Sequence, residues 1–592
     1  MCKQVGCIGL LRCYRVVLPI QFHMNSLQRL KERLNRLFPA GVSFVLALLV
    51  LVPMAMLIFS SFRTGRPGMP GGAFSFINYI EAYSSLEIYI TIGRSLYFAA
   101  VVTAVTLLFG GFFAWLVERT NMPGRGFAYS TLLSSMAIPR MLFGISWILL
   151  LSPRIGLINY FLENMLGLPR FNVYSMSGMI FIQILSEIPT AFLMMQGTLR
   201  GMDPALEEAA SVSRSNTLST LRKITLPIMT PAVLAAAVYL FIINIEVFEI
   251  PGLIGLPAGI TLFSTAIYNN ATVLVPPNHG LANSYAIAFL LASILLIVLY
   301  RKATQHSERY STITGKGYRP RLIDLGVWRY FAFSVFMIFF VITILLPVLV
   351  LIYASLIPFY QVPSAKVFAR MSLQNYVSAI EAPWMGRVLK NTLLLMVVAP
   401  TASVLLAALV AWVVHRTRIN RKWKATIDIL SFLPTALPSI VIALSLLVVF
   451  LNVHFIPLYG TLWIIGLAFL IRYIPYTVRT ISAAVIQIHK ELEESAQVCR
   501  ATEIGAFFKI TVPLVAPALI NAWIWVAMHA CRAVSAALML YSAQNEILST
   551  RIWLIWRDGK VPMVCALSIM MIVLLVIISF VGRRIAQAVS RR

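Results

Sequence analysis

Residues 207–232 read EEAASVSRSNTLSTLRKITLPIMTPA, and residues 493–518 read EESAQVCRATEIGAFFKITVPLVAPA. Both stretches open with polar residues, although the 592-residue chain is 59% hydrophobic and only 12% charged. Soluble domains are about 25% charged. A polar stretch that occurs twice in so apolar a chain predicts a duplicated membrane protein, with one such stretch leaving the membrane in each half.

The apolar residues gather in blocks of about 20, the length at which an α-helix crosses the hydrocarbon core of a bilayer. Mean hydropathy is +0.85. A transmembrane β-barrel would instead show alternating segments of about ten residues. We therefore expect an all-α polytopic membrane protein surrounded by the lipid bilayer. Twelve spans are predicted, at 41–62, 95–117, 129–151, 177–197, 231–252, 283–300, 330–354, 392–414, 428–451, 462–480, 517–540 and 563–582.

Three further pairs of segments repeat in the same order along the chain. They are FINYIEAY around Asn78 with LQNYVSAI around Asn375, AWLVERT from Ala114 with AWVVHRT from Ala411, and AIPRMLFGIS from Ala137 with ALPSIVIALS from Ala436. Such a repeat indicates two parallel six-helix halves. The predicted organisation is a basic N-terminal segment at 1–40, a first half at 41–300, a basic linker at 301–329, a second half at 330–584 and a tail at 585–592.

The net charge of +27 indicates the orientation of the chain in the membrane. In a soluble protein it would suggest nucleic-acid binding, but in a membrane protein Lys and Arg concentrate in cytoplasmic loops. The linker at 301–329 holds seven Lys and Arg residues and the predicted outer loop at 253–282 holds none. We expect both termini and both polar stretches in the cytoplasm, and no nucleic-acid partner.

Each polar stretch is predicted to form a short surface helix followed by a return into the membrane. Acidic residues lie at its start, where the helix dipole favours them, and small residues follow, which allow another surface to approach closely. Next come two prolines, Pro227 and Pro231 in the first stretch and Pro513 and Pro517 in the second. Because proline interrupts a helix and suits the first turn of the next, we expect one helix to end there and the spanning helix to begin.

The two stretches resemble the EAA loop of permeases in ATP-binding-cassette (ABC) importers, Glu-Ala-Ala followed by a Gly and then by Ile-x-Leu-Pro. The first stretch carries the pattern at Glu208, Ala209, Ala210, Arg214, Ile224, Leu226 and Pro227. The second carries it at Glu494, Ser495, Ala496, Arg500, Ile510, Val512 and Pro513. Arg214 and Arg500 depart from the pattern, because the family has Gly at these positions.

The resemblance covers both halves and implies the type I ABC importer permease fold. In such importers each EAA loop forms a coupling helix that docks on an ATPase subunit, and closure of two ATPases switches the spans between inward- and outward-facing states. The chain has no Gly-x-x-x-x-Gly-Lys-Ser/Thr loop for nucleotide phosphates. We therefore expect a non-enzymatic subunit without a cofactor, which meets two copies of an ATPase that binds ATP and Mg. A substrate-binding protein would deliver cargo to the outer face of the bacterial inner membrane.

Residues 149–159, 248–268 and 535–556 resemble fused two-half permeases for ferric iron, so iron(III) is the expected cargo. Thiamine, phosphonates, sugar phosphates and polyamines, which related permeases carry, stay open as alternatives. A twelve-span transporter driven by an ion gradient is a further alternative, but it would leave the paired polar stretches unexplained. A membrane-embedded enzyme would need a catalytic cluster, and the chain shows no metal-binding Cys spacing or Ser/His/Asp set.

Ionisable residues inside spans are costly and are functional candidates. The candidates for a pathway or gate are Glu187, Glu246, Glu249, Arg472 and Arg532, with Arg140 and His529 also inside spans. The repeat gives Glu246 and Arg532 equivalent places, so these two are predicted to face each other between the halves. Such a pair can contact cargo, gate the pathway or hold helices together, and the sequence leaves these roles open. We expect no resident metal site.

Overall fold

The computed structural model describes residues 39–69, 71–202, 205–213, 215–304, 322–417, 419–499 and 501–590. Most of the segment predicted at 1–40 and of the linker predicted at 301–329 lies outside these residues, as do Arg214 and Arg500. The described part of the chain is helical and contains two isolated β-bridges but no strand. The predicted all-α class is confirmed.

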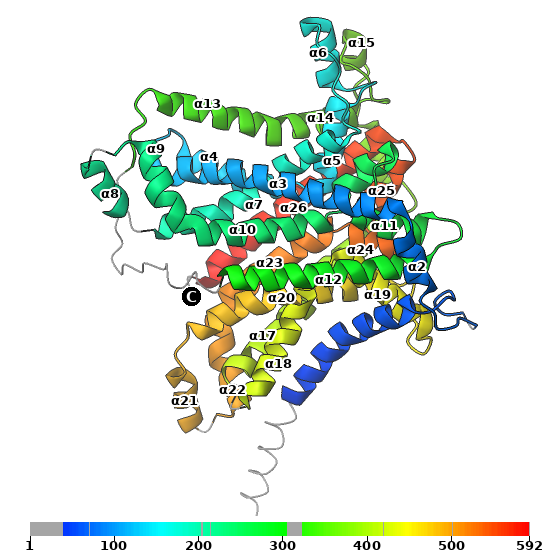
Figure 1. Cartoon of the computed structure of the whole chain (residues 1–592), viewed down its shortest axis with the longest axis vertical. Helices are drawn as coiled ribbons and strands as arrows, with labels where there is room; N and C mark the ends of the chain where they lie inside the picture. The colour runs from blue at the N-terminus through cyan, green and yellow to red at the C-terminus, as the bar shows by residue number, and fades with distance from the viewer. Residues whose placement is uncertain are drawn as a thin grey trace, which may run out of the picture.

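Ten helices of the described chain are long and apolar enough to cross a membrane, and most of them run from left to right in Figure 1. They are Pro39–Ser61, α3 (Leu86–Arg119), α7 (Met176–Gly201), η1 with α10 (Leu221–Glu246), most of α12 (His279–Thr304), α13 to α14 (Trp328–Leu356), α17 (Met385–His415), α20 (Leu462–Ile486), η8 with α23 (Phe507–Arg532) and most of α26 (Val561–Ser590). Shorter helices are α2 (Ile77–Ser84), α6 (Leu157–Leu166), α15 (Ala365–Phe368) and α16 (Gln374–Ile380). α26 continues into the tail predicted at 585–592.

The third span of each half, predicted as one span at 129–151 and at 428–451, is broken in the structure. In the first half α4 (Arg125–Ser135) and α5 (Arg140–Leu151) meet at 100°. In the second half α18 and η7 (Arg421–Ala436) meet α19 (Ser439–Asn452) at 105°. Pro139 and Pro438 stand just before α5 and α19. Proline has no N–H and disfavours helical backbone at the preceding residue, so the shared Pro in AIPR and ALPS ends one helix and starts the next.

The segment predicted as an outer loop at 253–282 largely folds back into the bundle. It forms the bent pair Pro251–Ala258 and Phe263–Val273, and most of its residues up to Tyr268 are buried. The Phe263 N–H donates to Ser95 Oγ at 2.8 Å. In the second half the Leu548 N–H donates to Thr392 Oγ1, also at 2.8 Å, at the start of α25 (Leu548–Arg557). The segment predicted as an outer loop is thus largely buried, and a buried side chain on α3 satisfies one of its backbone groups, as a buried side chain on α17 does at the start of α25.

The duplication extends to individual hydrogen bonds at the end of the first span of each half. Asn78 Nδ2 donates to the carbonyls of Ser61 and Arg63, both at 2.8 Å. Asn375 Nδ2 donates to the carbonyls of Ser355 and Ile357, both at 2.9 Å. The repeated asparagines therefore cap the carbonyl ends of equivalent helices, which the helices alone leave unpaired.

Each half is built on the contact of its second span with its fourth and fifth. α3 packs on α7 and α10, and α17 packs on α20 and α23. The two halves also interlock, because α14 (Leu346–Leu356) of the second half packs on α5 of the first. In the other direction, the Gly68 N–H donates to Asn452 Oδ1 of α19 at 3.2 Å.

Gly110 fixes the closest approach between α3 and α7. A Cβ atom at this position would lie 2.5 Å from Ala191 Cβ and 2.9 Å from the backbone nitrogen of Phe192. Small residues that let two helices approach closely are typical of interfaces within membranes. Gly93, also on α3, would meet nothing within 4 Å.

We predict that Gly110→Leu lowers the melting temperature of the purified protein in detergent. Overpacking of a tight contact costs about 1–3 kcal/mol, and here the neighbouring atoms are partly backbone, which cannot move aside. Gly93→Leu is the matched control and should melt like the unchanged protein. Equal melting temperatures for the two variants would show that the α3–α7 contact is looser than described.

Candidate functional site

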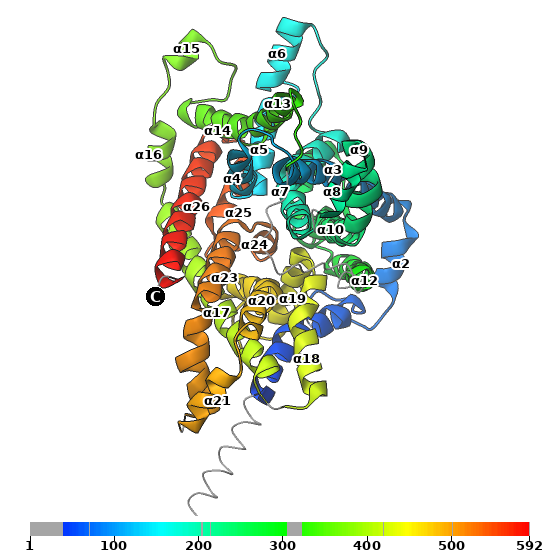
Figure 2. The same cartoon turned by 90° about the vertical axis from the view of Figure 1, so that its left-hand side faces the viewer.

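The two polar stretches fold in the same way. The first comprises α8 (Ala205–Val212), α9 (Thr217–Thr220), η1 (Leu221–Thr225) and the start of α10 (Leu226–Glu246), and the second comprises α21 (Glu491–Val498), α22 (Glu503–Ala506), η8 (Phe507–Thr511) and the start of α23 (Val512–Arg532). Figure 1 and Figure 2 show α8 and α21 at the same end of the bundle, projecting from the spans. The predicted short surface helix is thus present in both halves.

Equivalent hydrogen bonds shape the two loops. The Ser215 N–H donates to the carbonyl of Ala210 at 3.0 Å, and the Ala501 N–H donates to the carbonyl of Ala496 at 3.0 Å. These bonds close the C-terminal turn of α8 and of α21. The next short helix is capped by a side chain in each half, where Asn216 Oδ1 accepts from the Ser219 N–H and Thr502 Oγ1 accepts from the Gly505 N–H.

The helices do not end at Pro227 and Pro513, where the sequence predicts a break. Each proline is the second residue of a helix that continues directly from a π-helical turn, η1 or η8. A proline ring clashes with the carbonyl four residues earlier in a regular α-helix, and the wider π-turn relieves that clash. The break lies earlier, between α8 and α9 and between α21 and α22.

The structure separates the predicted loop residues into exposed and half-buried groups. Ala209, Glu494, Ser495, Leu226, Pro227 and Pro513 are exposed, and Ala210 is buried. Ala496, Ile224, Ile510 and Val512 are half-buried. The side chain of Glu208 and the residues Arg214 and Arg500 lie outside the described part of the structure.

A buried arginine that the sequence analysis did not single out holds the first loop. Arg119 Nη2, at the end of α3, donates to the carbonyls of Leu199 at 2.9 Å and Met202 at 3.2 Å. Its Nε lies 3.4 Å from Glu207 Oε2 of α8. Glu207 in turn accepts a hydrogen bond from Thr225 Oγ1 at 2.7 Å. We call Arg119, Glu207 and Thr225 the first loop clamp.

The second half repeats this arrangement. Arg416 Nη2 donates to the carbonyls of Val485 and Ile488, both at 2.7 Å. Its Nε lies 3.4 Å from Glu493 Oε1, and Glu493 accepts a hydrogen bond from Thr511. Arg416, Glu493 and Thr511 form the second loop clamp. In both clamps the arginine side chain is at most 4% exposed.

A cavity of about 510 Å³ lies between the two halves and is lined by charged side chains. The first half contributes Arg140, Glu246 and Glu249, and the second half contributes Arg472, Arg479, His529 and Arg532. The cavity therefore contains all the predicted pathway candidates except Glu187. That carboxylate is fully buried just behind Arg140.

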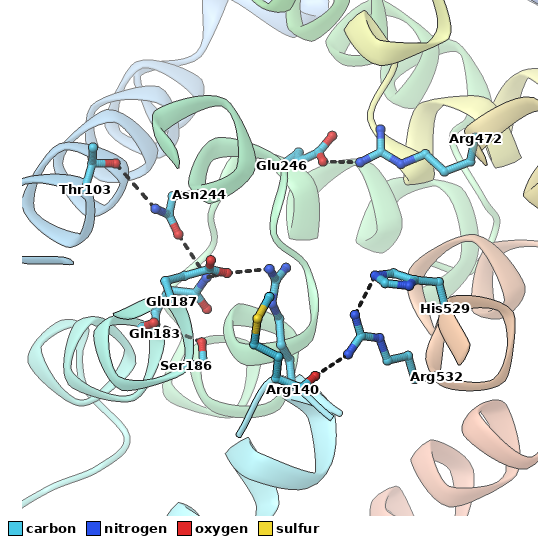
Figure 3. Close-up of polar contacts among 11 residues, drawn as sticks. Thr103, Arg140, Gln183, Ser186, Glu187, Asn244, Glu246, Arg472, His529 and Arg532 are labelled. Carbon is cyan, nitrogen blue, oxygen red and sulfur yellow. Dashed lines mark hydrogen bonds and ion pairs between the residues drawn. The ribbon is translucent and has the colours of Figure 1, made fainter. Parts of the chain in front are cut away.

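Two ion pairs organise the cavity (Figure 3). Arg140 pairs with Glu187 inside the first half, and Arg472 pairs with Glu246 across the halves. The prediction that Glu246 faces Arg532 is therefore wrong. Equivalent positions in a duplicated chain need not be neighbours. The partner of the Glu246 carboxylate is Arg472 on α20, the span before the one that carries Arg532.

Arg532 bonds instead to the broken span of the other half. Its Nη1 donates to the carbonyl of Met136 at 2.6 Å, and its Nη2 contacts His529 (Figure 3). Arg472 bonds to the break in its own half, because its Nη1 donates to the carbonyl of Leu437 at 3.1 Å. Backbone that leaves a helix at membrane depth must find such partners. The arginines thus serve both the cavity and the helix breaks.

Comparison with known protein families identifies the chain. The family described as binding-protein-dependent transport system inner membrane component matches residues 106–309 and 403–592. The two matches fall one in each half and together cover more than half of the chain. This chain belongs to that family. It is an ABC importer permease of the inner membrane with both halves fused, and the family description implies a substrate-binding protein as its partner.

Three relatives cover most of this permease. The ferric transport system permease protein FbpB of Actinobacillus pleuropneumoniae is 26% identical over 83% of this chain and 70% of its own length. The putative ferric transport system permease protein FbpB 1 of Haemophilus influenzae is 26% identical over 77% and 71%, respectively. The Fe(3+)-transport system permease protein FbpB 2 of Haemophilus influenzae is 23% identical over 80% and 85%.

The clamp residues are recognisable in the sequence, although they lie outside the EAA pattern. Arg119 and Arg416 are the shared arginines of AWLVERT and AWVVHRT, the only basic residues that those two segments have in common. Glu207 and Glu493 stand one position before the acid of the family pattern. Because an arginine and an acid repeat together in both halves, their pairing was open to inference from the duplication.

We predict a coupling energy between Glu246 and Arg472. Glu246→Gln and Arg472→Gln should each destabilise the permease by about 1–3 kcal/mol, less than for a fully buried pair, because Arg472 is 25% exposed. The double variant should lose less than the sum of the two, as measured by thermal unfolding in detergent. Glu249→Gln, at a cavity carboxylate without an ion pair among the described residues, is the control. Strictly additive losses would contradict the pairing.

Proposed function

We propose that this permease imports iron(III) and is driven by two copies of an ATPase subunit that dock on α8 and α21. The observation that carries the ATPase docking is the pair of identically folded loops at one end of the bundle (Figure 2). The observation that supports iron is the similarity of most of the chain to three permeases named for ferric transport. Thiamine, phosphonate, sugar phosphate and polyamine remain alternative cargoes to be tested beside it.

The proposed mechanism uses the cavity between the halves as the pathway. The ATPases bind ATP and Mg, and their closure displaces α8 and α21 and turns the halves relative to each other. Glu246–Arg472 and the Arg532–Met136 contact both join the halves beside the cavity, so both must part when the pathway opens between the halves. Glu187, Glu246, Glu249, Arg472 and Arg532 are thus proposed as gate and pathway residues, with Arg140 positioned by Glu187.

The proposed orientation has both termini in the cytoplasm. α26 ends at the same end of the bundle as α8 and α21 (Figure 1) and carries Arg583 and Arg584 in its last turns. Basic residues concentrate on the cytoplasmic side. The loops would then face the compartment that contains ATP.

We predict that Glu494→Lys together with Glu208→Lys weakens capture of the partner ATPase by the purified permease. Glu494 is exposed on α21, and a reversed charge at the centre of a docking surface weakens binding by about 2 kcal/mol or more, or about 30-fold. Glu81→Lys, an exposed acid on α2 at the opposite end, is the control. Unchanged ATPase binding by the double variant would remove the loops from the docking surface.

We predict ATP-dependent uptake of ⁵⁵Fe(III) into proteoliposomes that contain the permease, its ATPase and an iron-loaded binding protein. The same vesicles are offered thiamine, phosphonate, sugar phosphate and polyamine with the corresponding binding proteins. Uptake of one of these without uptake of iron would reassign the cargo. Uptake driven by a proton gradient without ATPase would refute the importer mechanism as a whole.

A further inference from the structure

Each loop clamp ties a projecting helix to the bundle through one guanidinium. Arg119 belongs to α3, and the carbonyls that it binds, those of Leu199 and Met202, lie at the end of α7. Its carboxylate partner Glu207 belongs to α8 and is bonded to Thr225 at the end of η1. Arg119 thus links the second span, the fourth span and the surface helix, and Glu207 extends the link to the start of the fifth span.

The second clamp makes the same four links with different neighbours. Arg416 follows α17, Val485 and Ile488 lie at the end of α20, Glu493 belongs to α21, and Thr511 ends η8. Many residues around the two clamps differ, for example Leu221-Arg222 against Phe507-Phe508. The same three residue types nevertheless meet in both clamps, and both Arg–Glu distances are 3.4 Å.

The clamp is the charged link between the surface helix and the spans. α8 packs mainly on α9 and η1 of its own loop, and α21 packs on α22 and η8. Apolar contacts of so short a helix allow sliding. The clamp limits this, because a guanidinium held by two backbone carbonyls of the spans is ion-paired at 3.4 Å with a carboxylate of the surface helix, and that carboxylate is itself hydrogen-bonded to a threonine. Because the arginines are buried, solvent screens these contacts little.

We propose that Arg119 with Glu207, and Arg416 with Glu493, are positioning residues that make each loop move as one body with its second, fourth and fifth spans. This inference rests on the proposed docking of ATPases on α8 and α21. It assigns separate tasks to adjacent acids: the acid of the family pattern, which is exposed at Glu494, meets the ATPase, and the acid before it, half-buried at Glu207 and buried at Glu493, transmits the displacement. Loss of the clamp lets the loop follow the ATPase while the spans stay behind.

The test compares transport with ATP hydrolysis in the reconstituted importer. In the variant R119Q/R416Q, ATPase binding should stay within about twofold of the unchanged permease. Cargo moved per ATP hydrolysed should fall about tenfold, within the usual range of coupling between sites. R200Q/K509Q, which removes two exposed basic residues of the same regions, is the matched control and should keep the ratio.

Milder variants keep the test decisive if the glutamine variant does not fold. R119K/R416K retains the positive charge but loses the guanidinium that donates to two carbonyls at once. T225V/T511V removes only the hydroxyls that donate to Glu207 and Glu493. Both should lower cargo per ATP while their melting temperatures stay close to that of the unchanged permease. A normal ratio in folded variants would overturn the clamp's role, and so would loss of ATPase binding in parallel with transport. An unchanged permease that binds no ATPase at all would instead refute the proposed function.

Discussion

Backbone polar groups inside an apolar bundle must be hydrogen-bonded, and this requirement determines where the charges of the permease lie. Pro139 and Pro438 break a span in each half and free carbonyls at the breaks. Arg532 and Arg472 donate to those carbonyls. Half-buried guanidiniums in turn need anionic or polar partners, which Glu246 and His529 supply. The charged cavity is thus a consequence of two helix breaks.

The duplication is retained in the elements that shape the helices and the loops, and it is lost in the residues that line the cavity. The asparagine caps, the broken third spans, the π-turns and the loop clamps recur in both halves. The cavity instead takes two acids, Glu246 and Glu249, from the first half and three arginines, Arg472, Arg479 and Arg532, from the second. Symmetric loops suit docking of two identical ATPase subunits. An asymmetric cavity suits a single cargo that contacts different residues of the two halves.

Much of this architecture was accessible from the sequence, because it depends on local composition. The apolar blocks predicted the helices, the repeated segments predicted two halves, and the polar stretches predicted the projecting loops. The sequence did not give the bent third spans, although Pro139 and Pro438 were visible, since prolines also occur inside continuous helices such as α7. The burial of residues 251–268 depends in part on a hydroxyl of a distant helix, that of Ser95, and Thr392 serves the start of α25 in the same way.

The cavity pairs were the least predictable part of the site. Glu246 and Arg472 are 226 residues apart, and their contact depends on how far each half is rotated against the other. The sequence repeat places Arg532 at the position equivalent to Glu246. The guanidinium of Arg532 is instead bonded to the carbonyl of Met136 and to His529. In contrast, the clamps were within reach of sequence reasoning, since an acid and a base repeated together at matched positions.

The interlocking of the halves bears on how the chain is made. The Gly68–Asn452 bond joins residues 384 positions apart, and α14 packs on α5 of the opposite half. At a synthesis rate of about 5–20 residues per second, the first span waits about 20–80 s for this neighbour. During that interval the nascent first half stands in the bilayer with an unfilled flank, so lipid or the insertion machinery must cover it until about half of the second half has been translated.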